Sequence, residues 1–242
     1  MPKITCVMAV YNTPLVVEMG VCSVLHQTFK DFELIIIDDS TDETPEVIAA
    51  LVGSDRRVVH IRESRRLCVP AKWDMAAGRA RGEWIAQFDA DDYHPPCRLG
   101  IQLATMEAAG PSFGLCHIPR PYWCNPAEGE GVWQHDQPGI PLQGVFESSF
   151  FYPREVWSKI GGNGGTENWQ AGRPFLLKLM RAGLNSVAAP SDYSEHTLGI
   201  EHGRNMFGRR LHLPVYRKTA LRWRDMLSPW ALEVCERLRY PT

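Results

Sequence analysis

Hydrophobic and polar positions follow a regular rhythm over the first 90 residues. Short apolar runs, typical of buried strands, occupy 4–10, 32–37, 57–61 and 84–88. Between them apolar residues recur at helical spacing, and we expect helices that begin at Thr13-Pro14 and Thr44-Pro45 and a third that covers 71–81. Strands that alternate with helices in this order predict a parallel sheet covered on both faces by helices, with ligands at the carboxyl ends of the strands.

The rest of the chain is less regular. Residues 111–141 are rich in Pro, Gly, Trp and His, and we expect a loop-rich region with some strands. Residues 146–152 have the pattern of a strand, and 154–160 that of a short helix. A GGNGG loop follows, and then a helix over 175–182 that Gly183 ends. The whole pattern predicts one α/β domain followed by a tail.

The composition excludes several classes of protein. Of the 242 residues 44% are hydrophobic, enough for one sizeable core, and the 26 basic and 28 acidic residues nearly cancel. The whole chain therefore has no strong attraction to nucleic acid or anionic lipid. No apolar run approaches the roughly 20 residues that cross a bilayer, and the first residues lack the layout of a signal peptide, so we expect a cytoplasmic protein. The seven cysteines form no CxxC pair, which disfavours a disulfide framework and a structural zinc site.

Acidic residues gather directly after two of the predicted strands. Asp38 and Asp39 follow the second strand, where they could also serve as ordinary turn and helix-cap residues. Asp89, Asp91 and Asp92 follow the strand at 84–88. Three carboxylates within four residues repel one another, and partial burial raises their pKa values unless a cation is present. Mg²⁺ or Mn²⁺ shared with a substrate diphosphate would remove the repulsion, and a solvated acidic turn is the alternative.

Four stretches of the sequence resemble glycosyltransferase family 2. They are VMAVYN (7–12), SVLHQTFKDFELIIIDDSTDETPEVI (23–48), ARGEWIAQFDADDYHPPCRL (80–99) and, more loosely, FYPREVWSKIGG (151–162). The resemblance implies the GT-A fold, a Rossmann-like and mostly parallel sheet flanked by helices, here with a helical C-terminal extension. It also implies transfer of a sugar from a nucleotide-diphospho-sugar, with a UDP-sugar expected, to an acceptor hydroxyl, with inversion and with Mn²⁺ or Mg²⁺ as cofactor.

The resemblance assigns roles to individual residues. Tyr11 would pack on the nucleobase, and Asp39 would accept a hydrogen bond from it. Asp91 would bind the metal directly, and Asp89 would lie close to the ribose or the metal. The full set that it implies for the donor site is Ala9, Tyr11, Asn12, Asp39, Lys72, Asp89 and Asp91.

Three positions depart from the family pattern. Ala9 stands where some relatives carry a hydroxyl residue. Lys72-Trp73-Asp74 replaces a frequent Ala-Arg-Asn, so that Lys72, Arg65 or Arg66 would supply the cation for the diphosphate, although a lysine on a helix is more often simply solvated.

The third departure concerns the carboxylate that takes the proton of the acceptor hydroxyl. The family places an acidic pair before a helix similar to FLLKLMRAG (175–183), where this chain has Ala171-Gly172. Glu167 is our first candidate for this catalytic base and Glu147 the second, and an ordinary surface role for Glu167 is the alternative.

The C-terminal part offers a histidine and a basic segment. His196 and His202 lie after the last predicted core helix, where the resemblance implies a late histidine at the metal or diphosphate in some GT-A enzymes. We prefer His202 as a metal ligand because Gly203 lets the loop approach closely, and an ordinary packing or capping role is the alternative. Residues 204–224 mix cations with Leu and Trp. Three readings stay open for this segment: a peripheral contact at the inner membrane face, a phosphate-backbone contact, or a helix packed on the core.

We therefore expect a glycosyltransferase domain over 1–205 and a basic helical extension over 206–242. The partners are a nucleotide-sugar donor and an acceptor glycan, lipid-linked saccharide or nucleic acid. Two alternatives stay open. One is a nucleotide-sugar-binding protein without turnover, which the missing acidic pair favours. The other is a related nucleotidyltransferase, which the lack of glycine in VMAVYNTP disfavours.

Overall fold

The structure is a computed structural model that describes residues 1–119, 122–135, 147–167, 172–190, 197–202 and 216–239. Within these residues the main sheet has the strand order β3-β2-β1-β4-β8-β5-β9. Its strands are β1 Ile4–Val10, β2 Phe32–Asp38, β3 Val58–Arg62, β4 Trp84–Asp89, β5 Phe113–His117, β8 Phe151–Pro153 and β9 Asn185–Ala188. Strands β1 to β4 pair in parallel, β8 runs antiparallel to both of its neighbours, and β5 and β9 are parallel. The predicted α/β fold with a mostly parallel sheet is confirmed.

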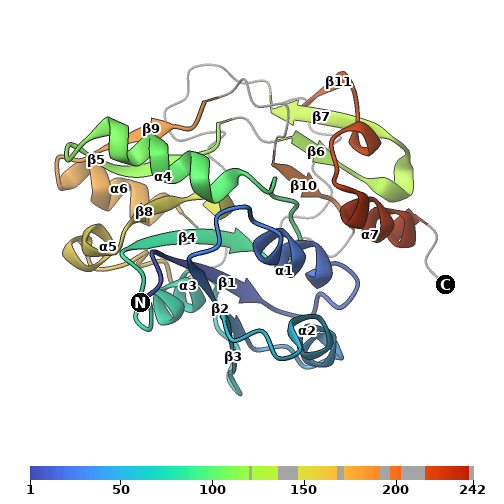
Figure 1. Ribbon diagram of the computed structural model, residues 1–242, viewed down its shortest axis with the longest axis horizontal. Helices are drawn as coiled ribbons and strands as arrows, with labels where there is room; N and C mark the ends of the chain where they lie inside the picture. Colours follow the sequence, from blue (N-terminus) through green and yellow to red (C-terminus); the bar gives the residue numbers. More distant parts are fainter. Residues whose placement is uncertain (120–121, 136–146, 168–171, 191–196, 203–215, 240–242) are drawn as a thin grey trace.

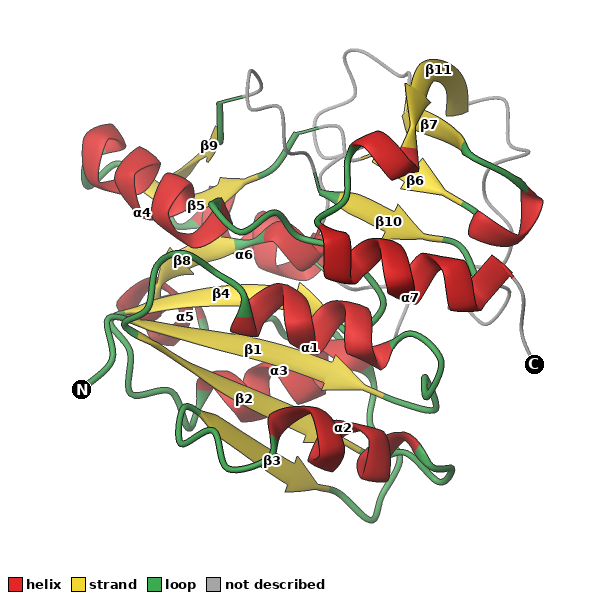
Figure 2. Cartoon of the chain, turned by 45° about the vertical axis from the view of Figure 1, so that its right-hand side comes forward, coloured by secondary structure: helices red, strands yellow, loops and turns green. Residues whose placement is uncertain are grey.

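Helices cover both faces of this sheet (Figures 1 and 2). They are α1 Val17–Leu25, α2 Thr44–Val52, α3 Val69–Ala77, α4 Arg98–Ala109, α5 Arg154–Ile160, α6 Arg173–Arg181 and α7 Pro229–Arg239. Side chains of β1 alternate between two cores, because neighbouring strand residues point to opposite faces. Ile4 and Met8 pack with residues of α1, α2 and α4, whereas Val7 and Ala9 pack with residues of α3, α5 and α6.

A second sheet lies beside the first, in the order β10-β6-β7-β11. Its strands are β6 Tyr122–Cys124, β7 Gly131–His135, β10 Leu198–Ile200 and β11 Tyr216–Arg222. Its apolar side chains form a third core with α7, including Val132, Trp223 and Val234. Three short 3-10 helices, Pro126–Glu128, Glu147–Ser149 and Trp223–Asp225, complete the described elements.

The C-terminal extension differs in part from the prediction. Residues 216–222 of the basic segment form strand β11, which pairs antiparallel with β7, and the helix of the extension is α7 further along the chain. Arg222 forms ion pairs with Glu130 and Asp225, and Arg224 with Glu130 and Glu236. These cations are therefore partly neutralised by the protein itself. The predicted boundary at 205 lies outside the described residues.

Two further elements of the structure differ from the sequence prediction. Helix α4 was not among the predicted elements. The predicted strand over 146–152 is instead a 3-10 turn, Glu147–Ser149, followed by the short strand β8, because the hydroxyls of Ser148 and Ser149 bond to neighbouring segments rather than project from a sheet. Within the described residues, each helix is too short or too polar to span a bilayer.

Candidate active site

The carboxyl ends of β1, β2 and β4 lie at one edge of the sheet. The register places Val10 beside Asp38 and Ala9 beside Asp89. Because the three strands are parallel, the loops that follow them meet at this edge, as the sequence predicts. Tyr11, Asp39 and Asp91 are therefore brought together from three separate segments of the chain.

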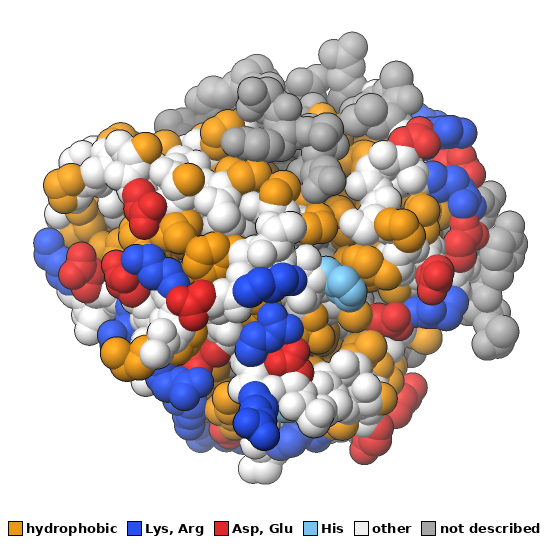
Figure 3. Space-filling model, viewed as in Figure 1, with side chains coloured by type: hydrophobic (Ala, Val, Ile, Leu, Met, Phe, Trp, Pro, Cys, Tyr) orange, Lys and Arg blue, Asp and Glu red, His pale blue; other side chains and the backbone are white. Residues whose placement is uncertain are grey.

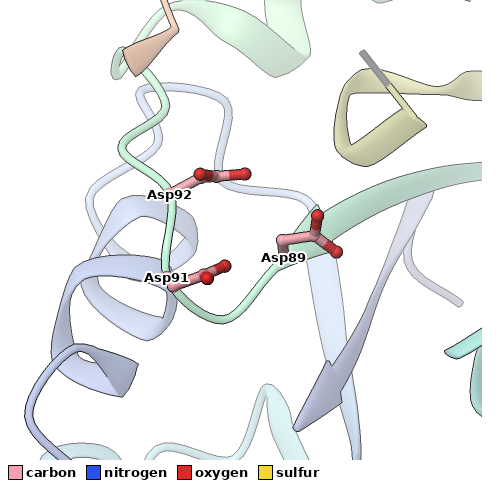
Figure 4. Close-up of side chains that lie close together, drawn as sticks. All are labelled: Asp89, Asp91 and Asp92. Atoms are coloured by element: carbon pink, nitrogen blue, oxygen red, sulfur yellow. The ribbon is translucent and has the colours of Figure 1, made fainter. Parts of the chain in front are cut away.

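Asp89, Asp91 and Asp92 form a compact group in the turn after β4 (Figure 4). One carboxylate oxygen from each residue lies within 4.8 Å of those of the other two. Asp92 is buried, and the hydroxyl of Ser148 donates to its Oδ2 atom at 3.1 Å. Three convergent carboxylates are the donor set that a hard divalent cation such as Mg²⁺ or Mn²⁺ prefers. The residues present therefore fit the predicted metal.

Helix α1 holds this turn from one side through Gly20. The backbone N–H of Gly20 donates to the carbonyl of Ala90 at 3.2 Å. A Cβ atom at this glycine would lie 2.6 Å from the carbonyl oxygens of Asp89 and Ala90, closer than real Cβ contacts. Gly20 thus permits the close approach of α1 to the acidic turn. The sequence holds a single unremarkable glycine here, and its role is visible only in the fold.

A buried arginine lies behind the acidic turn. Arg98, at the start of α4, is 1% exposed. Its guanidinium donates to the carbonyl of Gln87 at 2.5 Å and to the Oε1 atom of Gln102 at 2.9 Å, and it lies 3.9 Å from the ring centre of Phe88. Burial lowers the pKa of Arg98 to about 9, so it stays charged at neutral pH. The charges of Asp89 and Asp92 act against burial and raise the pKa of Arg98.

His202 lies against the acidic group. Its Nε2 atom is 3.1 Å from Oδ2 of Asp91, and its side chain is 7% exposed. The backbone brings it there, because Tyr93 and Leu198 exchange two hydrogen bonds of 2.9 Å and so fasten β10 to the segment after Asp92. The imidazole contacts one aspartate rather than joining the group of three ligand atoms. His196 lies outside the described residues.

Asp39 and Lys72 form a buried ion pair between the loop after β2 and helix α3. Asp39 also accepts hydrogen bonds from the backbone N–H of Leu67 at 2.6 Å and from Arg66 at 2.9 Å. Burial raises the pKa of Asp39, but these bonds outweigh burial and hold the pKa below the ordinary value. Burial lowers the pKa of Lys72, against the pull of Asp39. Lys72 is therefore not the solvated lysine that its place on a helix suggested.

Tyr11 is partly exposed, and a cation lies over the face of its ring. The guanidinium carbon of Arg66 lies 3.4 Å from the ring centre, and Nζ of Lys72 lies 5.6 Å from it. Asn12 has a positive φ of 48° and ties the loop after β1 to the loop after β2, since its Oδ1 atom accepts the N–H of Thr41 at 2.8 Å. Ala9, by contrast, is buried in the core.

The two candidate bases lie in different surroundings. Glu167 is exposed, two residues after the GGNGG loop. Glu147 is half-buried in the 3-10 turn whose next residue, Ser148, donates to Asp92. Its side chain passes directly beside Gly172, the residue before α6. The structure therefore places Glu147 in a segment that is bonded to the acidic group through Ser148. Ala171 lies outside the described residues.

One cavity of about 660 Å³ lies at the opposite edge of the sheet. Its lining includes Glu83, Trp84 and Arg154, at the amino end of β4. None of the predicted site residues lines it. The candidate chemistry is therefore at the carboxyl edge, where the charged side chains converge.

The sequence model of glycosyl transferase family 2 matches residues 5–158, well over half of the chain. The chain belongs to glycosyl transferase family 2. Within the family, it is 37% identical over 109 residues to an uncharacterized glycosyltransferase of Methanocaldococcus jannaschii, which covers 44% of this chain and 38% of the relative. It is 32% identical over 108 residues to the UDP-Glc:alpha-D-GlcNAc-diphosphoundecaprenol beta-1,3-glucosyltransferase WfaP of Escherichia coli, which covers 44% and 42%.

A solved structure of the same fold is similar over a longer stretch. The mannosyltransferase PcManGT of Pyrobaculum calidifontis, in complex with GDP-Man and Mn²⁺, matches with a TM-score of 0.63 at 18% identity, over 85% of this chain and 58% of that chain. The GT-A fold that the resemblance implied is confirmed by this likeness. The chain spans less than half of the length of the two curated relatives.

Proposed function

We propose that the protein transfers a sugar from a UDP-sugar to an acceptor hydroxyl, with inversion and with a divalent cation. The observation that carries the proposal is the group of three aspartates after β4, whose ligand atoms lie within 4.8 Å of one another, with His202 in contact with Asp91. This group lies at the edge of the sheet where β1 and β2 also end. A nucleotide-diphospho-sugar bound there would have its diphosphate at the acidic group and its base at Tyr11 and Asp39.

Two observations support uridine as the nucleoside of the donor. Asp39 is ionised and offers only acceptor atoms, so it favours a base that presents a ring N–H, as uracil does. The similar transferase WfaP carries UDP-Glc in its name. Asp39 accepts hydrogen bonds from Leu67 and Arg66 and forms an ion pair with Lys72. The carboxylate that would bind the base is therefore already held in position.

The remaining roles in the proposed reaction are metal binding and proton transfer. Asp89, Asp91 and Asp92 would hold the cation, and His202 and Ser148 would fix two of these carboxylates. A bound Mn²⁺ or Mg²⁺ would supply Lewis-acid stabilisation of the charge on the leaving diphosphate. A separate carboxylate takes the proton of the acceptor hydroxyl as its oxygen attacks the anomeric carbon from the face opposite the diphosphate.

We propose a lipid-linked saccharide as the acceptor, because the name of the similar enzyme WfaP gives a GlcNAc-diphosphoundecaprenol as its acceptor. A nucleic-acid acceptor is less favoured, because acidic and basic side chains are interspersed on the face in Figure 3 and because Arg222 and Arg224 are paired with acids. A peripheral membrane contact and a cytoplasmic location stay predictions.

Purified protein incubated with UDP-glucose, UDP-galactose or UDP-N-acetylglucosamine and Mn²⁺ tests the proposal. We expect slow release of UDP even without acceptor, and loss of both release and Mn²⁺-dependent UDP binding in Asp91→Asn. Asp31→Asn, an exposed aspartate at the other edge of the sheet, is the control and should behave as wild type. UDP binding by calorimetry without release from any donor would instead indicate a binding protein without turnover.

A further inference from the structure

The start of helix α6 lacks the acids that the family pattern places there. Helix α6 begins at Arg173, and Gly172 occupies its N-cap position with a φ of 73°. A glycine carries no side chain that could accept a proton. The carboxylate for this task must therefore come from another segment of the chain, if the transfer proposed above takes place.

The side chain of Glu147 fills the space that a side chain at 172 would need. A Cβ atom built on Gly172 would overlap Cγ of Glu147, and it would lie 2.9 Å from Cβ and 3.2 Å from Cδ of the same residue. Both distances are shorter than ordinary carbon contacts of 3.5–4.0 Å. A residue larger than glycine at 172 would thus clash with Glu147. The side chain of Glu147 occupies the position from which an acidic side chain at 172 would extend.

Hydrogen bonds fix the turn that carries Glu147. The hydroxyl of Ser148 donates to Oδ2 of Asp92 at 3.1 Å. The hydroxyl of Ser149 accepts the N–H of Ile118 at 2.9 Å, and the carbonyl of Ser149 accepts from the side chain of Gln102 at 2.7 Å. Ser148 and Ser149 are both buried. Ser148 therefore holds the turn on the acidic group, and Ser149 holds it on α4 and on the residue after β5. Such fixed placement suits a group that must be positioned for chemistry.

We propose that Glu147 is the catalytic base of this enzyme and replaces the acid absent at 172. The inference rests on the function proposed above and names the proton acceptor of that reaction. The carboxylate of Glu147 takes the proton of the acceptor hydroxyl, the hydroxyl oxygen forms the bond to the anomeric carbon, and the bond from that carbon to the diphosphate oxygen breaks with its electron pair. Glu167, exposed on its loop, is a surface acid without this role.

The first test compares two conservative variants. Glu147→Gln should lower Mn²⁺-dependent UDP release from the UDP-sugar that wild type turns over by about 100-fold or more, the typical contribution of a general base. Its affinity for UDP with Mn²⁺, measured by calorimetry, should stay within about twofold, because the group acts on the acceptor side. Glu167→Gln, the matched control, should retain wild-type release. A Glu147→Gln variant that stays fully active overturns the proposal, and so does loss of activity in Glu167→Gln alone.

The second test displaces Glu147 without changing it. Gly172→Ala should lower turnover with little change in UDP affinity, since the new methyl group overlaps Cγ of Glu147. Gly183→Ala is the matched control: Gly183 has the same φ of 73°, but a Cβ there meets no atom within 4 Å. Both variants place a Cβ at a positive φ, but only the one at 172 meets Glu147, so a lower turnover in Gly172→Ala than in Gly183→Ala reports on Glu147. Equal activities of the two variants would contradict the proposal.

These experiments distinguish failure of the proposed function from failure of the assignment of Glu147 as the base. Wild-type protein that neither releases UDP nor binds it with Mn²⁺ refutes the proposed function itself. Wild-type turnover together with an active Glu147→Gln refutes only the assignment of the base. Should Glu147→Gln unfold, as circular dichroism would show, the pair Gly172→Ala and Gly183→Ala decides the question.

Discussion

Lys72 and Asp39 form a buried ion pair between helix α3 and the loop after β2. The side chain of Lys72 is 1% exposed and that of Asp39 is fully buried. The same ammonium donates to the carbonyl of Val10 at 2.6 Å. One lysine therefore joins the ends of β1 and β2 to α3, at the edge of the sheet where the candidate site lies.

Replacement of Lys72 by methionine should destabilise the fold. The change leaves the buried carboxylate of Asp39 without its buried partner, a loss of roughly 3–5 kcal/mol when no other cation is near. Because Arg66 and the N–H of Leu67 remain, we expect a smaller loss of about 2 kcal/mol, measured by urea unfolding. Lys3→Met, which removes a surface pair with Glu83, is the control, with a change within about 1 kcal/mol. Equal stabilities for the two variants would show that the buried pair adds nothing.

The contact between Arg66 and Tyr11 leads to a second prediction, on nucleoside binding. The guanidinium lies 3.4 Å from the ring centre and also donates to Asp39, so it occupies two groups that the proposal assigns to the base. Arg66→Gln should uncover the ring and raise the affinity for uridine about two- to fivefold, in line with a cation–π contact of roughly 0.5–1 kcal/mol.

UDP distinguishes this effect from a general change in the site. Arg66 is also a candidate cation for the diphosphate, and its loss removes that attraction. The ratio of UDP affinity to uridine affinity should therefore fall in Arg66→Gln, as calorimetry with both ligands would show. An unchanged ratio would mean that Arg66 does not contact the phosphates, and an unchanged affinity for uridine would mean that it does not cover the base site.

The sequence was most informative where local patterns decide the structure. The strands after which the acids stand are continuous apolar runs, typical of a sheet buried on both faces, and their parallel pairing brings the acids to one edge. The parallel part of the main sheet and the place of Asp89 and Asp91 at its carboxyl edge follow from this pattern. Helix α4 was missed although Leu99, Leu103 and Met106 recur at helical spacing after Pro95-Pro96.

Other features depend on residues far apart in the chain, and no local pattern reveals them. Lys72 lies 33 residues from Asp39, and His202 lies 111 residues from Asp91. Residues 216–222 have the composition of a basic amphipathic helix, yet pairing with β7 makes them a strand, since tertiary context overrides propensity in sheets. The contact between Glu147 and Gly172 belongs to the same class.

His202 should strengthen metal binding through Asp91. Its Nε2 atom lies 3.1 Å from Oδ2 of that residue, and such a contact orients a carboxylate toward a cation. We expect His202→Ala to weaken Mn²⁺ binding about tenfold, the lower end of the effect seen when partners of metal ligands are removed, as measured by Mn²⁺ titration in the presence of UDP. His202→Gln can keep a donor near Asp91 and should lose less. His26→Ala, which removes an exposed histidine that stacks on Trp230, should bind Mn²⁺ as wild type does. If His202→Ala also keeps wild-type affinity, the histidine serves only to fasten the segment after β10, and the cation depends on the three aspartates alone.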